Sequence, residues 1–114
     1  MRIEGNTISM IRGDSESLTI RCQEPDGDAH PFQEGDKVYF TIKKSEYTQV
    51  KLFQKVVTAF GEEGEAQVEI SPEDTREMDF GVYRYDVQLT DREGRVTTIL
   101  PPGDFILCGE VTYE

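Results

Sequence analysis

The sequence has no tryptophan, one histidine and two cysteines, and it has little positive charge: 12 Lys and Arg stand against 23 Asp and Glu, a formal net charge of −11. Binding to a nucleic-acid backbone or to anionic lipid depends on Lys and Arg, so this excess of acidic residues argues against both partners. No apolar run approaches the roughly 20 residues of a membrane-spanning helix, and the first residues lack the apolar stretch of a secretory signal. We therefore expect a soluble protein that is synthesised in the cytoplasm.

The two cysteines, Cys22 and Cys108, are far apart in the sequence. Cys22 continues the alternation of Leu18 and Ile20, so we expect it to face the core as a small apolar side chain. Disulfides are rare in proteins of the cytoplasm, and we predict two free thiols.

The shortage of histidine and cysteine also argues against a histidine-activated nucleophile and against a zinc site. A nucleophile activated by histidine would need His30, which lies in a predicted loop, and the sequence has no Gly-x-Ser-x-Gly turn or glycine-rich phosphate loop. One histidine and two distant cysteines do not have the spacing of a zinc site. Asp26, Asp28 and Asp36 could offer oxygen ligands to calcium, but the D-x-D-x-D-G loop and its closing glutamate are missing. We predict no enzymatic activity, no cofactor and no metal.

The sequence does have period-two alternation of polar and apolar residues, which is typical of half-buried strands. A chain of 114 residues has the size of one domain, and we predict a single domain over residues 1–114. Turn residues separate the alternating segments. The predicted strands are 7–11, 17–22, 37–43, 51–60, 66–70, 82–90, 95–100 and 105–113. Seven or eight short strands in this length predict an all-β fold, an immunoglobulin-like two-sheet antiparallel sandwich.

One short helical turn is predicted near residues 72–78. Ser71 can cap the exposed N–H groups, Pro72 suits the first helical position, and Asp74 takes the place of the acidic partner in a capping box. Tyr83 then stands near the start of a long strand. In immunoglobulin-like sandwiches a tyrosine at this place turns its hydroxyl back to the preceding corner, so we predict a structural corner at Tyr83.

Two motifs have a functional and a structural interpretation. Arg12-Gly13-Asp14 spells a tripeptide that integrins bind, but Gly and Asp are also the residues that a turn requires. Tyr83 and Tyr85 could form a stacking platform for a ligand, but the alternation directs both toward the core, where each hydroxyl needs a hydrogen-bond partner. We favour the structural interpretation of both motifs.

Positive charge is concentrated at one place, where Lys43, Lys44, Lys51 and Lys55 flank a predicted hairpin. Lysines at the edge of a sheet discourage the addition of a further strand. In the alternative interpretation, the lysines meet an acidic patch on another copy of the chain.

A set of strand and turn motifs spans nearly the whole chain: RGDS at 12–15, EPDG at 24–27, VYFTIKK at 38–44, AQVEISPEDT at 66–75, FGVYRYDV at 80–87 and TDREG at 90–94. Together they resemble the immunoglobulin-like N-terminal domain of phage baseplate upper proteins and the small phage and prophage proteins of Gram-positive bacteria with the same layout. The resemblance implies a non-enzymatic building block that attaches the rest of a protein to the tail tip. Long members continue into a stalk or receptor-binding region that is missing here, so the resemblance implies assembly or surface decoration.

We therefore expect a phage or prophage structural or accessory protein that is made in the host cytoplasm and carried in the virion after assembly. Its expected partners are other phage structural proteins or copies of itself in a homo-oligomer. Aromatic residues outside the core often anchor interfaces, and the candidates are Tyr39, Tyr47, Phe53 and Tyr113. The alternative function is a carbohydrate-binding or cell-surface adhesion module. That function predicts a row of exposed aromatics on one sheet, and the lack of tryptophan weakens it.

Overall fold

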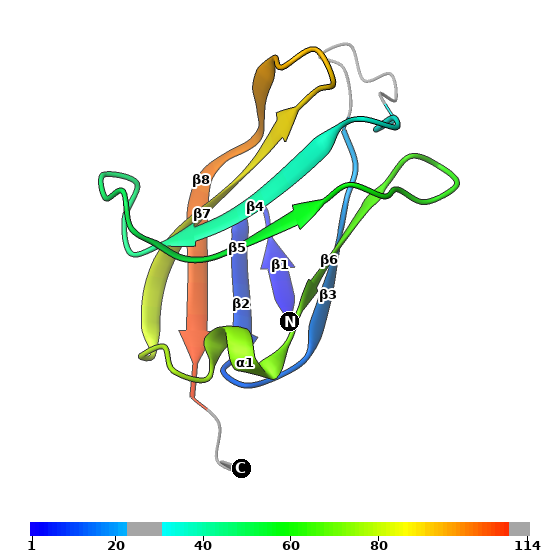
Figure 1. Ribbon diagram of the computed structural model, residues 1–114. Coiled ribbons are helices and arrows are strands. Elements are labelled where there is room, and N and C mark those ends of the chain that lie inside the picture. The colour runs from blue at the N-terminus through cyan, green and yellow to red at the C-terminus, as the bar shows by residue number, and fades with distance from the viewer. Residues whose placement is uncertain (23–30, 110–114) are drawn as a thin grey trace.

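In a computed structural model, the chain forms eight strands and one short helix (Figure 1). The structure describes residues 1–22 and 31–109. The elements are β1 (Arg2–Glu4), β2 (Thr7–Ile11), β3 (Glu16–Ile20), β4 (Lys37–Lys43), β5 (Lys51–Val57), β6 (Ala66–Ile70), α1 (Pro72–Thr75), β7 (Gly81–Thr90) and β8 (Val96–Cys108).

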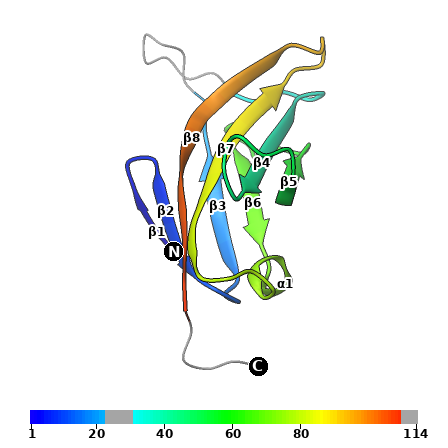
Figure 2. The same cartoon turned by 90° about the vertical axis from the view of Figure 1, so that its left-hand side faces the viewer.

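The strands form two sheets, one of six strands in the order β1-β2-β8-β7-β4-β5 and one of two strands, β3-β6. Figure 2 shows β1 and β2 on one flank of the larger sheet and β4 and β5 on the other. The inner faces of both sheets contribute to one hydrophobic core. This is the predicted immunoglobulin-like sandwich, with one departure from antiparallel pairing: β2 and β8 are parallel.

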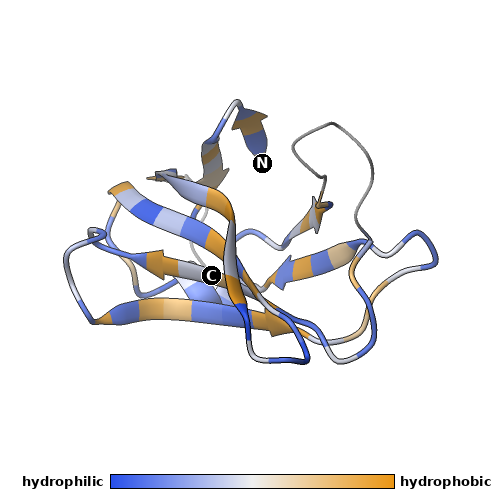
Figure 3. Cartoon of the chain, turned by 90° about the horizontal axis from the view of Figure 1, so that it is seen from above, coloured by the Kyte–Doolittle hydropathy of each residue, from blue (hydrophilic) through white to orange (hydrophobic). Residues whose placement is uncertain are grey.

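Alternation along the strands sets what faces the core, as the banded colouring in Figure 3 illustrates. In β4, Val38, Phe40 and Ile42 point inward and are fully buried, while the residues between them are partly exposed. In β7, Tyr85 and Val87 are buried in the same way. Period-two burial of β-branched and aromatic side chains is what stabilises a half-buried strand, so these assignments from the sequence are confirmed.

The helix α1 is shorter than the predicted 72–78. The carboxylate of Asp74 accepts hydrogen bonds from the backbone N–H of Ser71, 2.8 Å from N to Oδ2, and from the Ser71 hydroxyl at 3.1 Å. This capping interaction agrees with the sequence prediction. The helix ends early because the N–H of Met78 bonds to the carbonyl of Thr75 at 2.9 Å and closes a turn that leads toward β7.

The end of the chain differs most from the prediction, because 95–100 and 105–113 are not two strands. They belong to one strand, β8, which continues through Pro101 and Pro102. Tyr85 pairs with Gly103 and Val87 with Leu100, so both prolines lie opposite a single residue of β7. A bulge of this kind tolerates proline, which has no N–H for the ladder.

Three further boundaries are corrected. The predicted strand 17–22 is Glu16–Ile20, and the predicted strand 51–60 ends at Val57. The strand β1 was missed because its three residues are all exposed and carry no alternation of burial. β8 ends at Cys108, and the remainder of the predicted 105–113 falls partly outside the described residues.

Candidate interaction surface

The two inward tyrosines of β7 hold the strand in position by hydrogen bonds, and the outer face of the six-stranded sheet lies on the other side of the same strand. The hydroxyl of Tyr83, 8% exposed, donates to the carbonyl oxygen of Asp79 at 2.7 Å, which confirms the predicted structural corner. The hydroxyl of Tyr85 donates to the backbone oxygen of Asn6 at 2.8 Å. Burial raises the pKa of both hydroxyls, so both remain protonated donors at neutral pH. Neither tyrosine is a surface platform.

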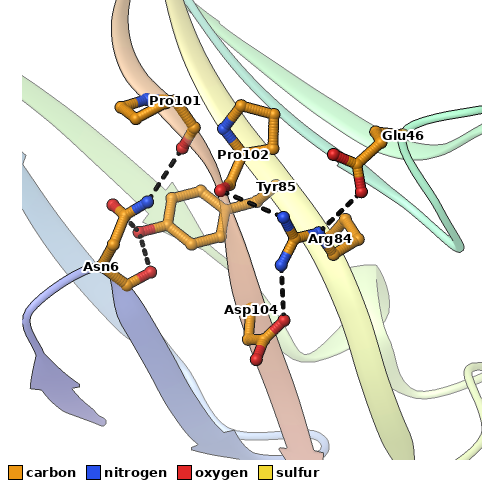
Figure 4. Close-up of polar contacts among 7 residues, drawn as sticks. All are labelled: Asn6, Glu46, Arg84, Tyr85, Pro101, Pro102 and Asp104. Atoms are coloured by element: carbon orange, nitrogen blue, oxygen red, sulfur yellow. Dashed lines mark hydrogen bonds and ion pairs between the residues drawn. The ribbon is translucent and has the colours of Figure 1, made fainter.

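Asn6 also holds the proline segment of β8 in place (Figure 4). Its side-chain amide donates to the carbonyl oxygen of Pro101 at 2.9 Å. Gly103, two residues further along β8, lies so close that a Cβ there would collide with the Asn6 carbonyl. The turn between β1 and β2 is thereby locked against the centre of the six-stranded sheet.

Arg84 projects from the opposite, outer face of β7 and links three segments (Figure 4). Its Nη1 is 2.7 Å from Oδ1 of Asp104 on β8, and its Nε is 3.1 Å from Oε1 of Glu46 in the β4–β5 hairpin. Its Nη2 also donates to the carbonyl oxygen of Pro102 at 3.2 Å. The hydrogen bond with Asp104 is the main cause that raises the pKa of the guanidinium. Arg84 therefore holds the hairpin against the sheet.

Around Arg84 the outer face contains a hollow of about 280 Å³ lined largely by polar side chains of β4, β5 and β7. Among them are Thr41, Lys43, Lys51, Gln54, Arg84 and Asp86. The amide of Gln54 donates to the hydroxyl of Thr41 at 2.8 Å across the β4–β5 ladder. Burial raises the pKa of the Asp86 carboxyl, and the charge of Lys43 acts in the opposite direction.

Three cations lie in register across three strands on this face. Lys43 of β4 is opposite Arg84 of β7 on one side and opposite Lys51 of β5 on the other. Like charges directly opposite each other destabilise a sheet. Arg84 is neutralised by its two carboxylate partners, whereas Lys51 makes no ion pair with a described residue. Lys51 is thus a cation of this row whose charge is not neutralised by an ion pair with a described residue.

Exposed apolar side chains stand beside this row, in the hairpin tip and the first residues of β5. Tyr47 is 90% exposed, Val50 67% and Leu52 42%. The β4–β5 register shifts between Ile42 and Lys43, which leaves Leu52 as the extra residue, and a bulge re-aims side chains in this way. The surface formed by Lys43, Lys44, Tyr47, Val50, Lys51 and Leu52 is called the basic hairpin here.

The aromatic candidates from the sequence have different positions. Tyr47 is on the surface, as expected, and Tyr39 is half-buried on the outer side of β4. The expected exposure of Phe53 is wrong, because its ring faces inward, 6.5 Å from that of Phe40 and 6.4 Å from that of Phe105. Tyr113 lies outside the described residues.

The lysine positions agree with the edge interpretation, because β5 is the last strand of its sheet. Lys55 is opposite the buried Phe40 and so stands on the inner side, where its ammonium is 2.7 Å from Oδ2 of Asp74 on α1. An inward charge on an edge strand opposes the addition of a further strand. The other three lysines, Lys43, Lys44 and Lys51, lie at the turn end of the β4–β5 hairpin.

A second exposed apolar group was not anticipated from the sequence. Phe80 is 53% exposed, Val82 59% and Ile11 44%, at the α1 end of the outer face. The guanidinium of Arg12 lies 4.1 Å from the centre of the Phe80 ring, a cation–π contact. The alternation of β7 could have indicated Val82, which occupies an outward position in a run of apolar and aromatic residues.

The remaining sequence motifs have structural roles or fall outside the described residues. Gly13 has a φ of 85°, and its N–H donates to the Thr75 hydroxyl at 2.9 Å, so the Arg12-Gly13-Asp14 motif is a turn packed on α1. Asp36 accepts the N–H of Gln33 within a turn. His30, Asp26 and Asp28 lie outside the described residues.

The thiols and the charged groups form no reactive cluster in the part that the structure describes. Cys22 packs partly buried against the core, as predicted, Cys108 is exposed, and neither forms a disulfide. Within residues 1–22 and 31–109, no group of three or more His, Cys, Asp or Glu is placed to hold a metal ion. In the same ranges no helix is long and apolar enough to cross a membrane.

Neither a protein-family profile nor a curated protein matches this chain.

Proposed function

We propose that the chain is a non-enzymatic building block of a phage or prophage virion, and that it acts through protein–protein contacts made by the basic hairpin and the adjoining outer face of the six-stranded sheet. The motif resemblance supports the virion setting. Its partners are other virion proteins or further copies of the chain. The alternative, a carbohydrate-binding or adhesion module, has less support, because Tyr47 and Phe80, the exposed aromatics of residues 1–22 and 31–109, lie on separate segments and form no row there.

The single observation that carries the contact role is the hairpin tip. A tyrosine that is 90% exposed, with two exposed aliphatic neighbours and lysines beside it, leaves apolar surface in contact with water in the isolated chain. Burying that surface against a partner is favourable. Tyrosine on a surface of this kind is a frequent anchor of protein interfaces. Arg84 holds the hairpin through Glu46, so the tip is presented by an ordered support.

The test is the protein content of purified particles. Phage particles are induced from the strain that encodes the chain, banded on a density gradient, washed with salt and analysed by quantitative mass spectrometry. The proposal predicts the chain in a fixed ratio to the major capsid protein. Absence from intact particles, or a level no higher than that of an abundant host cytoplasmic protein, overturns it.

A further inference from the structure

The two ends of β5 carry opposite charge. The basic hairpin lies at the start of the strand, and the loop 58–65 follows its end with Glu62, Glu63 and Glu65. In Figure 1 the hairpin projects on the left of the molecule and this loop on the right. We call Glu62, Glu63 and Glu65 with their turn the acidic loop. A single copy therefore presents a positive surface at one end and a negative surface at the other.

The basic hairpin has charge that its own chain does not neutralise. Lys44 and Lys51 are exposed and make no ion pair with a described residue. Lys43 has Lys51 and Arg84 as its cross-strand neighbours, and its charge acts on the carboxyl of Asp86. Carboxylates of a second molecule would relieve this like-charge row.

The acidic loop is an ordered surface. Gly64 donates to the carbonyl of Gly61 at 2.9 Å, and its own carbonyl accepts the N–H of Phe32 at 2.9 Å. The ring of Phe32 lies 5.3 Å from that of Phe60, which supports the loop from below. The only ion pair of its glutamates within the described residues joins Glu63 to Arg21 at 4.0 Å, with both side chains more than half exposed. Such a pair contributes little, so the exposed carboxylates of Glu62 and Glu63 remain open to a partner. The carboxylate of Glu65 accepts the backbone N–H of Glu63 at 3.1 Å and shapes the loop.

We propose that the basic hairpin of one copy binds the acidic loop of a second copy, head to tail. The lysines of the basic hairpin meet the glutamates of the acidic loop. Because each copy has both surfaces at opposite ends, the contact is heterologous and extends to a ring or a filament. This inference rests on the proposed function in that it names one partner of the same surface.

The net charge of the chain determines how the proposed self-association depends on salt concentration. Copies with a net charge of −11 repel one another, so association requires the local match. At about 0.15 M salt the screening length is about 8 Å, which reduces the general repulsion more than a direct Lys–Glu contact. At about 1 M salt the direct contact is also screened, and association should weaken.

The test is a charge swap followed by sedimentation velocity at about 0.15 M salt. One variant carries Lys44→Glu and Lys51→Glu, and the other carries Glu62→Lys and Glu63→Lys. All four side chains are exposed, so both variants should fold, which circular dichroism and thermal unfolding verify. We expect the wild type to self-associate, each variant alone to associate at least tenfold more weakly, and an equimolar mixture of the two to regain association.

The matched control carries Arg2→Glu and Lys37→Glu, two exposed cations outside the basic hairpin, one on β1 and one at the first residue of β4. It has the same net charge as the lysine variant, −11 − 4 = −15, and should associate clearly better than that variant. A wild type that is monomeric up to millimolar concentration overturns the inference. So does a mixture that stays dissociated while both variants are folded. Either result leaves the particle analysis above unaffected, so failure of this contact and failure of the virion role are distinguishable.

Discussion

Tyr83 and Tyr85 lie on the same face of β7, and their hydroxyls bond to different parts of the chain. The hydroxyl of Tyr83 closes the corner that leads from α1 into β7 by bonding to Asp79. That of Tyr85 reaches the turn between β1 and β2 through Asn6. The two hydroxyls thus hold the start of β7 and the β1–β2 turn in place by hydrogen bonds from the core side of the sheet.

Removing the Tyr83 hydroxyl should weaken the corner without opening a cavity. We expect Tyr83→Phe to lower the free energy of unfolding by about 1 kcal/mol, because the part-buried hydrogen bond to the backbone oxygen of Asp79 is lost. Urea unfolding followed by circular dichroism measures this loss. Tyr39→Phe is the matched control, because the Tyr39 hydroxyl makes no hydrogen bond with the described residues, and it should change stability little. Equal effects of the two substitutions would contradict the corner assignment.

The Asp74 carboxylate links α1 to the edge strand β5 and gives stability a defined pH dependence. Burial acts to raise the pKa of Asp74, but hydrogen bonds from Lys55 and Ser71 outweigh it, and the pKa lies below its usual 3.8. A depressed pKa means that this stabilisation is complete above about pH 4 and is lost as the pH falls through the folded-state value.

We therefore expect Asp74→Asn to reduce the free energy of unfolding at pH 7 by about 1–2 kcal/mol, through loss of the charged hydrogen bonds. The difference from the wild type should shrink as the pH is lowered below about 4. Urea unfolding at pH 7 and at acidic pH tests both statements. Glu73→Gln on the exposed side of α1 serves as the control. A difference that is constant with pH would mean that the charge of Asp74 has no part in it.

At the scale of single elements, the bulge in β8 decides how the outer face is built. Pro101 and Pro102 occupy the extra positions opposite β7, and Gly103 brings the strand against Asn6. The carbonyl of Pro102 then accepts from Arg84. Arg84, which holds the basic hairpin, thus depends in part on the position of the Pro102 carbonyl in the bulge of β8.

Gly103→Ala should destabilise the fold by about 1–3 kcal/mol, because the added Cβ would collide with backbone as well as with the Asn6 side chain. Gly61→Ala offers a contrast, since its Cβ would meet only the side chain of Glu65, which can move away. Thermal unfolding of both variants compares the two. If Gly61→Ala proved the more damaging, the close approach at Gly103 would not be the constraint that we infer.

The elements differ in how far the sequence could predict them. β4 and β7 were predictable because alternation and strand propensity act together over many residues. β1 was not, since three exposed residues carry no pattern. The continuity of β8 was not predictable either, because proline normally ends a strand and only the pairing with β7 reveals the bulge.

The same limit applies to the interaction surface. Tyr83 bonds to Asp79 four residues away, so local sequence sufficed for the corner. Tyr85 bonds to Asn6 across 79 residues, which only the tertiary fold brings together. Phe53 was assigned to the surface because alternation alone does not say which face of an edge strand is inward, and a register error exchanges the two faces.

At the scale of the whole molecule, the six-stranded sheet separates a packed inner side from an outer side that carries charge and exposed apolar groups. The core accounts for stability, and the outer side and the two loop ends of β5 remain available for contacts. Because these two ends carry opposite charge, the molecule is electrostatically polar along β5. Assembly with a fixed orientation follows from that polarity if the partner surfaces are copies of the chain.

The most direct test of the account is the number of copies of the chain per purified particle, compared for the wild type and for the Lys44→Glu, Lys51→Glu variant, each expressed in a strain without its own gene. Quantitative mass spectrometry against the major capsid protein gives both numbers. We predict a fixed stoichiometry for the wild type and for the Arg2→Glu, Lys37→Glu control, and a clear reduction for the hairpin variant. A wild-type chain that is absent from intact particles would contradict the central claim.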